Sequence, residues 1–325
     1  MVSFLTEELV RRGHDVTLFA TGDSKTSARL RALRPTNLFD AIASGEVWKS
    51  EYYQVSNIVE ALREAADFDV IHCHLGCFSI PFSALTLTPL VHSLPSPLDD
   101  DDLWVLERHP DAAVTARSRR QVAAVPAGRR EKIKVIPNAC DFDAYECSPE
   151  PGRYLAFLGR MAWQKSPCDA IAIARQAGMP LVLAGEPWYA EEHEYFEQQV
   201  RPLIDGTSVI HIGPVNDVQK AEFLKNASAL LFPIQWEEPF GIVMIEAMAC
   251  GVPVVACNRG AVSEVIDPGV TGFYADDVET LASLVPAALS LDRRAVRDHA
   301  RQRFSIPRMV DQYLQFYESL LPAGQ

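Results

Sequence analysis

Two glutamates with seven residues between them flank the start of an apolar segment. Glu238 and Glu246 lie in EEPFGIVMIEAMACGVPVV, which covers residues 237–255. Glu238 precedes the helix that this segment predicts and Glu246 lies on it, so the two carboxylates can face one cleft from different elements. The alternative is a solvated helix start, where acidic side chains only interact with the positive end of the helix dipole.

The start of the same helix offers backbone groups that suit an anion. Pro239 favours a turn, and Gly241 opens the helix. The first N–H groups of a helix have no carbonyl partner within it, and they attract negative charge. We therefore expect the amides of Phe240, Gly241 and Ile242 to point toward an anionic ligand.

Two cations follow a predicted strand earlier in the chain. The segment AFLGRMAWQKS, residues 156–166, places Arg160 and Lys165 just beyond the strand end. Ligands of open α/β sheets bind at the carboxyl ends of the strands, so this pair can form a small cationic pocket. Two ordinary surface charges are the alternative.

A pair of histidines ends a strand in the first half of the chain. In DVIHCHLGCFS, residues 69–79, strand alternation sends His72 and His74 to one side and Cys73 to the other. A zinc site that uses all three side chains, with Cys77 as the fourth ligand, is therefore disfavoured. We expect His74 at the strand tip, facing the cleft, and a capping or hydrogen-bonding histidine is the alternative.

Apolar runs alternate with helical patterns along the chain, which is typical of parallel sheets with crossover helices. After an opening helix that ends near Gly13, the first half predicts strands at residues 16–20, 69–74, 89–94, 112–116 and 132–137. The second half predicts strands at residues 154–158, 180–184, 209–211, 229–232 and 253–256. The final helix, residues 307–321, carries one apolar face formed by Val310, Tyr313, Leu314, Tyr317, Leu320 and Leu321.

This alternation predicts an α/β protein of two doubly wound domains in tandem. A polar, proline-containing segment at residues 138–153 separates the halves. We expect an N-terminal domain over residues 1–148, a C-terminal domain over 149–304 and a last helix within 305–325.

Composition narrows the function classes. The chain has 325 residues, 48% hydrophobic and 22% charged, which suffices for two buried cores. Asp and Glu exceed Lys and Arg by 43 to 30, and the net charge of −13 disfavours general binding to nucleic acids. The longest uncharged stretch, residues 77–98, is interrupted by prolines and predicts no transmembrane segment. Seven scattered cysteines indicate reduced thiols in a cytoplasmic protein.

Together the motifs resemble the family 4 retaining glycosyltransferases, which have the GT-B fold of two Rossmann-like domains facing a cleft. Glu238 and Glu246 match the family's E-x7-E motif, and residues 159–165 match its G-R-x4-K loop. The resemblance implies that Glu238 contacts hydroxyls of the donor sugar and that Glu246 holds the ribose of the nucleotide. It also implies that Arg160 and Lys165 bind the donor diphosphate, where their charge stabilises the leaving group and no metal is required.

The resemblance implies roles for further positions. His74 would touch the donor sugar or assist the acceptor, and Pro214 and Val215 would line the base pocket. Residues 258–273 match the loop that closes the sheet behind the donor, where Glu264 has either a structural role or a substrate contact. The last helix would cross back onto the N-terminal domain.

The sequence departs from the family pattern in places. Pro95 stands where related sequences carry a histidine on the acceptor side, so no role transfers there. Ala139 replaces the glycine of the hinge motif N-G-x-D and is expected to stiffen that hinge. The aspartate run at residues 99–102 predicts a solvated helix start, with recognition of a cationic or polyhydroxylated acceptor as the alternative.

The chain also begins inside the first helix of the family pattern, without the strand and Gly-rich loop that precede it. That strand is central in doubly wound sheets, so we expect two strand edges to be exposed without it. The 325-residue form is expected to be poorly soluble or nearly inactive, and upstream residues are expected to restore it.

These features predict a metal-independent, retaining transferase that moves a hexosyl unit from a nucleotide diphosphate sugar to an acceptor hydroxyl. The expected donor is a UDP-sugar, UDP-glucose or a relative, with GDP-mannose second and no separate cofactor. The acceptor (saccharide, lipid-linked or small molecule) stays open, as does peripheral contact with a membrane. A catalytically inactive GT-B chain that binds a nucleotide sugar or a partner protein is the main alternative. A nicotinamide-dependent oxidoreductase is disfavoured because no G-x-G-x-x-G follows a strand.

Overall fold

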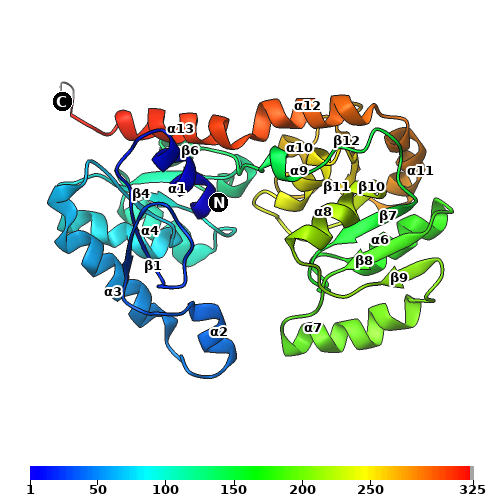
Figure 1. Cartoon of the computed structure of the whole chain (residues 1–325), viewed down its shortest axis with the longest axis horizontal. Coiled ribbons are helices and arrows are strands. Elements are labelled where there is room, and N and C mark those ends of the chain that lie inside the picture. The colour runs from blue at the N-terminus through cyan, green and yellow to red at the C-terminus, as the bar shows by residue number, and fades with distance from the viewer. Residues whose placement is uncertain (323–325) are drawn as a thin grey trace. The chain divides into compact units, whose positions relative to one another are not determined.

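The computed structural model describes residues 1–322 and divides into two compact units (Figure 1). The first unit comprises Met1–Pro137 together with the described chain from Ile306 on, and the second comprises Asn138–Ser305. Every sheet in both units is built from parallel strands, as the alternation of apolar runs and helical patterns predicted.

The strands of the first unit form two separate sheets. One sheet pairs β1 (Thr17–Ala20) with β2 (Arg29–Ala32). The other has the order β3-β4-β5-β6 and consists of β3 (Ile71–Cys73), β4 (Leu90–Ser93), β5 (Ala113–Ala116) and β6 (Lys134–Val135). Among the described residues, β1 and β3 therefore each have one neighbouring strand.

The helices of the first unit follow the sequence pattern. They are α1 (Val2–Arg11), α2 (Leu38–Ala43), α3 (Ser50–Arg63), α4 (Asp100–Arg108), α5 (Ala127–Arg130) and α13 (Ile306–Glu318), with 3-10 turns η1 (Ala65–Asp67), η2 (Gly76–Leu85) and η3 (Arg120–Val122). The uncharged stretch 77–98 folds as η2, β4 and a loop. Asp99 caps α4 by accepting the backbone N–H of Asp102 at 2.9 Å, so the aspartate run is a helix start, as predicted.

Helix α13 packs against α1 within the first unit (Figure 1). Its apolar face buries Val310, Tyr313 and Tyr317, whereas Leu321 at its predicted end is exposed. Arg12, the residue that follows α1, forms an ion pair with Asp311 of α13, with 2.5 Å between Nη1 and Oδ1. The two ends of this unit are thus held together by both apolar and ionic contacts.

The second unit contains one sheet of six parallel strands in the order β12-β11-β10-β7-β8-β9. These are β7 (Tyr154–Leu158), β8 (Leu181–Ala184), β9 (Val209–His211), β10 (Ala227–Phe232), β11 (Val254–Cys257) and β12 (Gly272–Ala275). All residues of β10 and β11 are buried, as expected for central strands that are covered on both faces.

Helices cover this sheet in two groups. The helical elements are η4 (Phe142–Ala144), α6 (Pro167–Gln176), α7 (Ala190–Tyr195), η5 (Phe196–Val200), η6 (Arg201–Leu203), α8 (Asp217–Lys225), α9 (Ile242–Ala249), α10 (Val262–Val265), α11 (Val278–Leu289) and α12 (Arg293–Phe304). Helices α6 and α11 pack against each other and the sheet, while α9 packs against α8, α12 and the sheet. Leu155, Leu183 and Leu230 are fully buried in the resulting core.

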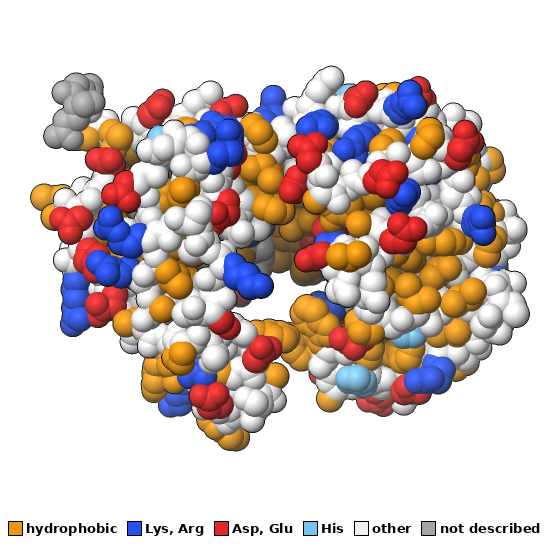
Figure 2. Space-filling model, viewed as in Figure 1, with side chains coloured by type: hydrophobic (Ala, Val, Ile, Leu, Met, Phe, Trp, Pro, Cys, Tyr) orange, Lys and Arg blue, Asp and Glu red, His pale blue; other side chains and the backbone are white. Residues whose placement is uncertain are grey.

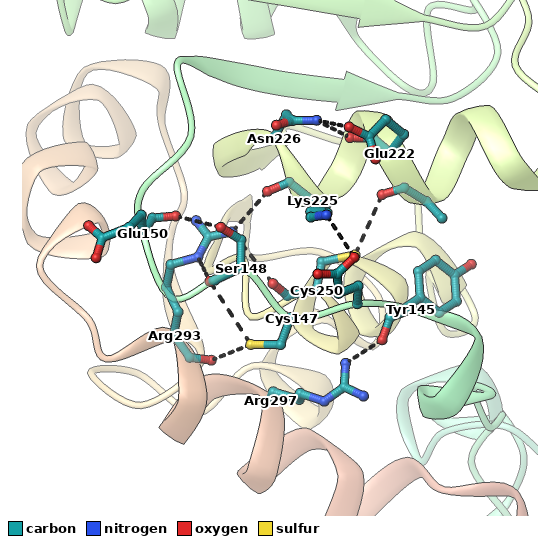
Figure 3. Close-up of polar contacts among 12 residues, drawn as sticks. Tyr145, Cys147, Ser148, Glu150, Glu222, Lys225, Asn226, Cys250, Arg293 and Arg297 are labelled. Carbon is teal, nitrogen blue, oxygen red and sulfur yellow. Dashed lines mark hydrogen bonds and ion pairs between the residues drawn. The ribbon is translucent and has the colours of Figure 1, made fainter.

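The two units divide at Pro137, earlier than the boundary that we expected at residue 148. Arg293 is buried and donates from Nε to the carbonyl of Ser148 at 2.8 Å, and Arg297 donates from Nη1 to the carbonyl of Tyr145 at 2.8 Å (Figure 3). A buried guanidinium needs acceptors, and the carbonyls of this segment supply them. These bonds attach the segment around Tyr145 and Ser148 to the second unit.

The structure also shows how the charged side chains are distributed and in which state the cysteines are. Figure 2 shows acidic and basic side chains intermingled over the visible face of each unit rather than gathered in one patch. In the described residues 1–322, no helix combines the length and the apolar character that crossing a membrane requires. All seven cysteines are free thiols.

Candidate active site

Arg160 lies just beyond the end of β7 and is paired with a carboxylate that the sequence did not reveal. Its Nη1 donates to Oε1 of Glu192, a residue of α7 that is only 4% exposed. The guanidinium carbon also lies 5.4 Å from the centroid of the Trp188 ring and 5.7 Å from that of Tyr189. Such aromatic faces attract a cation, so Arg160 is held by one charge and two rings.

Lys165 and Glu238 come together, although 73 positions separate them. The Lys165 ammonium pairs with Oε2 of Glu238, and the Trp236 indole N–H donates to the same oxygen at 3.0 Å. The ammonium also lies 4.9 Å from the centroid of the Trp236 ring. The cationic loop and the first glutamate of the E-x7-E motif therefore belong to one cluster within the second unit.

Glu246 projects from α9 and binds two donors through one oxygen. Its Oε1 accepts from Nζ of Lys220 at 2.7 Å and from the hydroxyl of Tyr145 at 2.9 Å. Neither donor was singled out in the sequence. The carboxylate is mostly buried, with 14% of the side chain exposed, and these two donors replace hydrogen bonds that water makes to an exposed carboxylate.

The turn before α9 has the geometry that the sequence predicted. Gly241 is the N-cap of α9 with φ of 79°, which favours glycine, and a Cβ there would lie 2.7 Å from Cε of Met244. Within the described residues, the backbone N–H groups of Phe240, Gly241 and Ile242 donate to no protein acceptor. They are available to an anion at the N-terminus of α9.

A second glycine supports this turn from the loop after β11. A Cβ on Gly260 would lie 2.2 Å from the carbonyl oxygen of Glu238, so only glycine allows this approach. The next residue, Ala261, donates its N–H to the same carbonyl at 2.9 Å. Glu264, expected to have either a structural role or a substrate contact, lies in α10, and its carbonyl accepts a bond from Arg303.

The loops after β7, β8 and β9 are joined side by side. Met161 donates its N–H to the carbonyl of Glu186 at 3.2 Å, and Gly185 donates to Gly213 at 2.8 Å. Pro214, which is exposed, and Val215, which is partly buried, follow in the third loop. The predicted base-pocket residues therefore lie in the loop after β9, which is hydrogen-bonded to the loop after β8. The loop after β8 is in turn hydrogen-bonded to the loop after β7 that carries Arg160.

His74 belongs to the first unit and follows β3. Its ring centroid lies 4.0 Å from that of His72, so the two rings share one side of the strand, as alternation predicted. Burial, and then the charge of Arg117, lower the pKa of His74 to about 4. The imidazole is therefore neutral at pH 7. Among residues 1–322, no group of three or more His, Cys, Asp and Glu side chains is placed to hold a metal ion.

Two family models match the chain in succession. Residues 1–144 match Glycosyltransferase Family 4, and residues 144–303 match Glycosyl transferases group 1. The chain belongs to the family 4 glycosyltransferases. The predicted family and enzyme class are confirmed, and the two α/β units are the Rossmann-like domains of the GT-B fold.

Similar proteins cover most of this glycosyltransferase. An uncharacterized 41.2 kDa protein in the cps region of Klebsiella pneumoniae is 26% identical over an alignment of 293 residues, which covers 78% of this chain and 79% of that protein. The D-inositol 3-phosphate glycosyltransferase of Mycolicibacterium smegmatis is 24% identical and matches 95% of this chain and 83% of its own length.

Solved structures of other proteins share this fold. AviGT4, a glycosyltransferase involved in avilamycin A biosynthesis, superimposes with a TM-score of 0.73 at 27% identity, covering 100% of this chain and 89% of AviGT4. Sucrose-phosphate synthase of Thermosynechococcus elongatus shares the fold, with a TM-score of 0.74 at 21% identity over 98% of this chain and 92% of that chain.

Proposed function

We propose that this glycosyltransferase moves a hexosyl unit from a UDP-sugar, UDP-glucose or a close relative, to an acceptor hydroxyl with retention of configuration and without a metal. The observation that carries the proposal is the Lys165–Glu238 pair, whose lysine lies in the same loop after β7 as Arg160. It combines cations that suit a diphosphate with a carboxylate that suits sugar hydroxyls, at the carboxyl end of one sheet.

The leaving diphosphate is assigned to Arg160, Lys165 and the free amides of Phe240, Gly241 and Ile242. As the bond between the anomeric carbon and the phosphate oxygen breaks, negative charge builds on the diphosphate. Fixed cations and aligned N–H groups stabilise that charge without reorganising, which lowers the barrier. They supply the positive charge that a divalent cation supplies in other enzymes, and this supports a metal-independent reaction.

The rest of the donor is assigned to carboxylates and a loop. Glu246 accepts hydrogen bonds from the ribose hydroxyls, and Glu238 accepts hydrogen bonds from hydroxyls of the transferred sugar. Pro214 and Val215 flank the base. His74 contacts the sugar or the acceptor in its neutral form. HepE of Anabaena, whose solved structure is a complex with UDP-glucose, shares the fold at 22% identity with a TM-score of 0.67, which supports a uridine nucleotide.

Retention follows if the acceptor attacks the face that the leaving group departs from. The acceptor oxygen forms the new bond to the anomeric carbon, and its proton passes to the leaving phosphate oxygen. No protein nucleophile is then required, and the cations next to that phosphate hold it in place for the proton. The acceptor itself stays open among saccharides, lipid-linked molecules and small molecules. The free thiols support a cytoplasmic location, which fractionation of cells that express the protein would test.

Donor hydrolysis and transfer across UDP-, GDP- and ADP-sugars test the proposal. We expect turnover to be highest with a UDP-sugar, to persist in excess EDTA, and to give a product whose anomeric configuration, read by NMR, matches the donor. Loss of turnover in EDTA, or an inverted product, would contradict the metal-independent or the retaining part. Absence of turnover with every donor would favour a chain that only binds nucleotide sugars.

A further inference from the structure

The segment that leads into the second unit is fixed at its backbone by two arginines of α12. Arg293 donates from Nη1 to the carbonyl of Ala227 at 2.9 Å as well as from Nε to that of Ser148. The Cys147 thiol lies 3.9 Å from the carbonyl oxygen of Arg293 (Figure 3). Arg297 donates to the carbonyl of Phe142 at 2.5 Å and to that of Tyr145 at 2.8 Å. The backbone of Tyr145 and of the residues before and after it is therefore held by hydrogen bonds, which fixes the point from which the Tyr145 side chain extends.

The Tyr145 hydroxyl donates a hydrogen bond to Glu246, 101 positions away in the sequence. It shares Oε1 of Glu246 with the ammonium of Lys220, at 2.9 and 2.7 Å. Among the described residues, the second oxygen, Oε2, accepts no hydrogen bond, and it is not sealed from solvent. Two donors thus saturate one oxygen and leave the other available.

Tyr145 and Lys220 both keep their protons, so both remain hydrogen-bond donors to Glu246. Burial, and then the charge of Glu246, raise the pKa of Tyr145, so its hydroxyl keeps its proton and donates. Burial lowers the pKa of Lys220, but the hydrogen bond and charge of Glu246 outweigh it and raise the pKa overall, so the ammonium stays charged. A carboxylate held by two fixed donors loses little freedom when a ligand arrives.

We propose that Tyr145 and Lys220 are positioning residues that turn Oε2 of Glu246 toward the ribose diol, and so make the enzyme select ribonucleotides over 2′-deoxyribonucleotides. The inference rests on the proposed ribose contact of Glu246. Tyr145 and Lys220 act through Glu246 and do not themselves touch the donor. Removing either leaves the carboxylate free to rotate, so the contact with the 2′-hydroxyl weakens while the diphosphate contacts remain.

The ratio of the dissociation constants of 2′-deoxy-UDP and UDP, measured by calorimetry on the full chain, tests this. We expect Tyr145→Phe and Lys220→Met each to lower that ratio by about tenfold, on the order of one hydrogen bond to a charged group, with 2′-deoxy-UDP binding nearly unchanged. Tyr154→Phe is the matched control, because the Tyr154 hydroxyl donates to the carbonyl of Phe223 at 2.8 Å in the same unit. It should leave the ratio unchanged.

The outcomes separate this inference from the proposed function. If Glu246→Gln removes the selectivity and the Tyr145 and Lys220 variants retain it, positioning is wrong and the ribose contact stands. If Glu246→Gln also retains it, the ribose contact is wrong. A Tyr145 variant that weakens UDP and 2′-deoxy-UDP equally has only a structural role, which overturns the inference for that residue. Because Lys220→Met leaves the held segment intact, it decides the case if Tyr145→Phe folds poorly.

Discussion

The guanidinium of Arg160 donates to a carboxylate oxygen of Glu192, and the other oxygen of that carboxylate accepts the backbone N–H of Trp188 at 2.9 Å. A cation that we assign to the donor diphosphate therefore has its own counter-ion, which also fixes the loop after β8. Since Glu192 is almost fully buried, its charge is compensated only while Arg160 stays in place.

Glu192→Ala is expected to lower the free energy of unfolding by about 1–3 kcal/mol, because both Arg160 and the Trp188 N–H lose their acceptor. Urea denaturation measures this. Glu197→Ala, which removes the partner of Arg201 in an exposed pair nearby, is the matched control and should cause no measurable change. Equal effects of the two substitutions would show that the Arg160 pair is an ordinary surface contact.

Lys165→Met is expected to lower kcat/KM for the donor by about a hundredfold, because a fixed positive charge at the developing diphosphate is lost. Steady-state turnover of the preferred donor measures this. The control is Lys225→Met in the same unit, where the ammonium pairs with Glu146 at 2.7 Å and with none of the residues assigned to the donor. Similar losses for both lysines would argue against a diphosphate role for Lys165.

Most of the sheet of the second unit could be predicted from the sequence, because β7, β8, β10 and β11 are mainly apolar and largely buried. Strand β2 was missed, since its residues RLRA carry two arginines and lie mostly exposed at a sheet edge. The short strand β12, GFYA, differs from the prediction as well, because its first two residues belong to the loop expected at residues 258–273.

Within the site, Glu238, Glu246, Arg160 and Lys165 could be predicted because each motif is local in the sequence. Their partners could not. Glu192 is 32 positions from Arg160, and Tyr145 is 101 positions from Glu246, so only the folded chain brings them together. The position of Trp236, two residues before Glu238, indicates a contact with that glutamate only weakly, because a tryptophan there is equally typical of a hydrophobic core.

Gly241→Ala should destabilise the protein more than Gly206→Ala, although both glycines have similar positive φ values of 79° and 74°. At Gly206 an added Cβ meets no atom within 4 Å, so only the backbone cost of about 1 kcal/mol applies. At Gly241 the Cβ would also lie 3.0 Å from the Phe232 ring, which raises the expected cost to roughly 2 kcal/mol or more. Urea denaturation compares the two, and donor affinity should fall only for Gly241→Ala. Equal costs would mean that the turn before α9 is not tightly packed.

Acid should destabilise the first unit because buried histidines are held neutral there. Burial lowers the pKa of His92 and that of His74 to about 4, and it lowers the pKa of His72 well below 6.5. Between pH 6.5 and 4 the unfolded chain therefore binds protons that the folded chain does not, so stability falls as the pH falls. Each histidine contributes up to about 1.4 kcal/mol per pH unit in this window.

His92→Gln tests this dependence, because His92 is fully buried and lies 2.7 Å from the hydroxyls of both Ser79 and Ser83. The substitution is expected to reduce the slope of unfolding free energy against pH by about one proton between pH 6 and 4.5. Above pH 7 the variant and the original protein should have equal slopes, whatever the difference in their absolute stability. An unchanged slope at acid pH would mean that His92 takes up a proton in the folded state, and that its two hydroxyl partners rearrange to accept the charged ring.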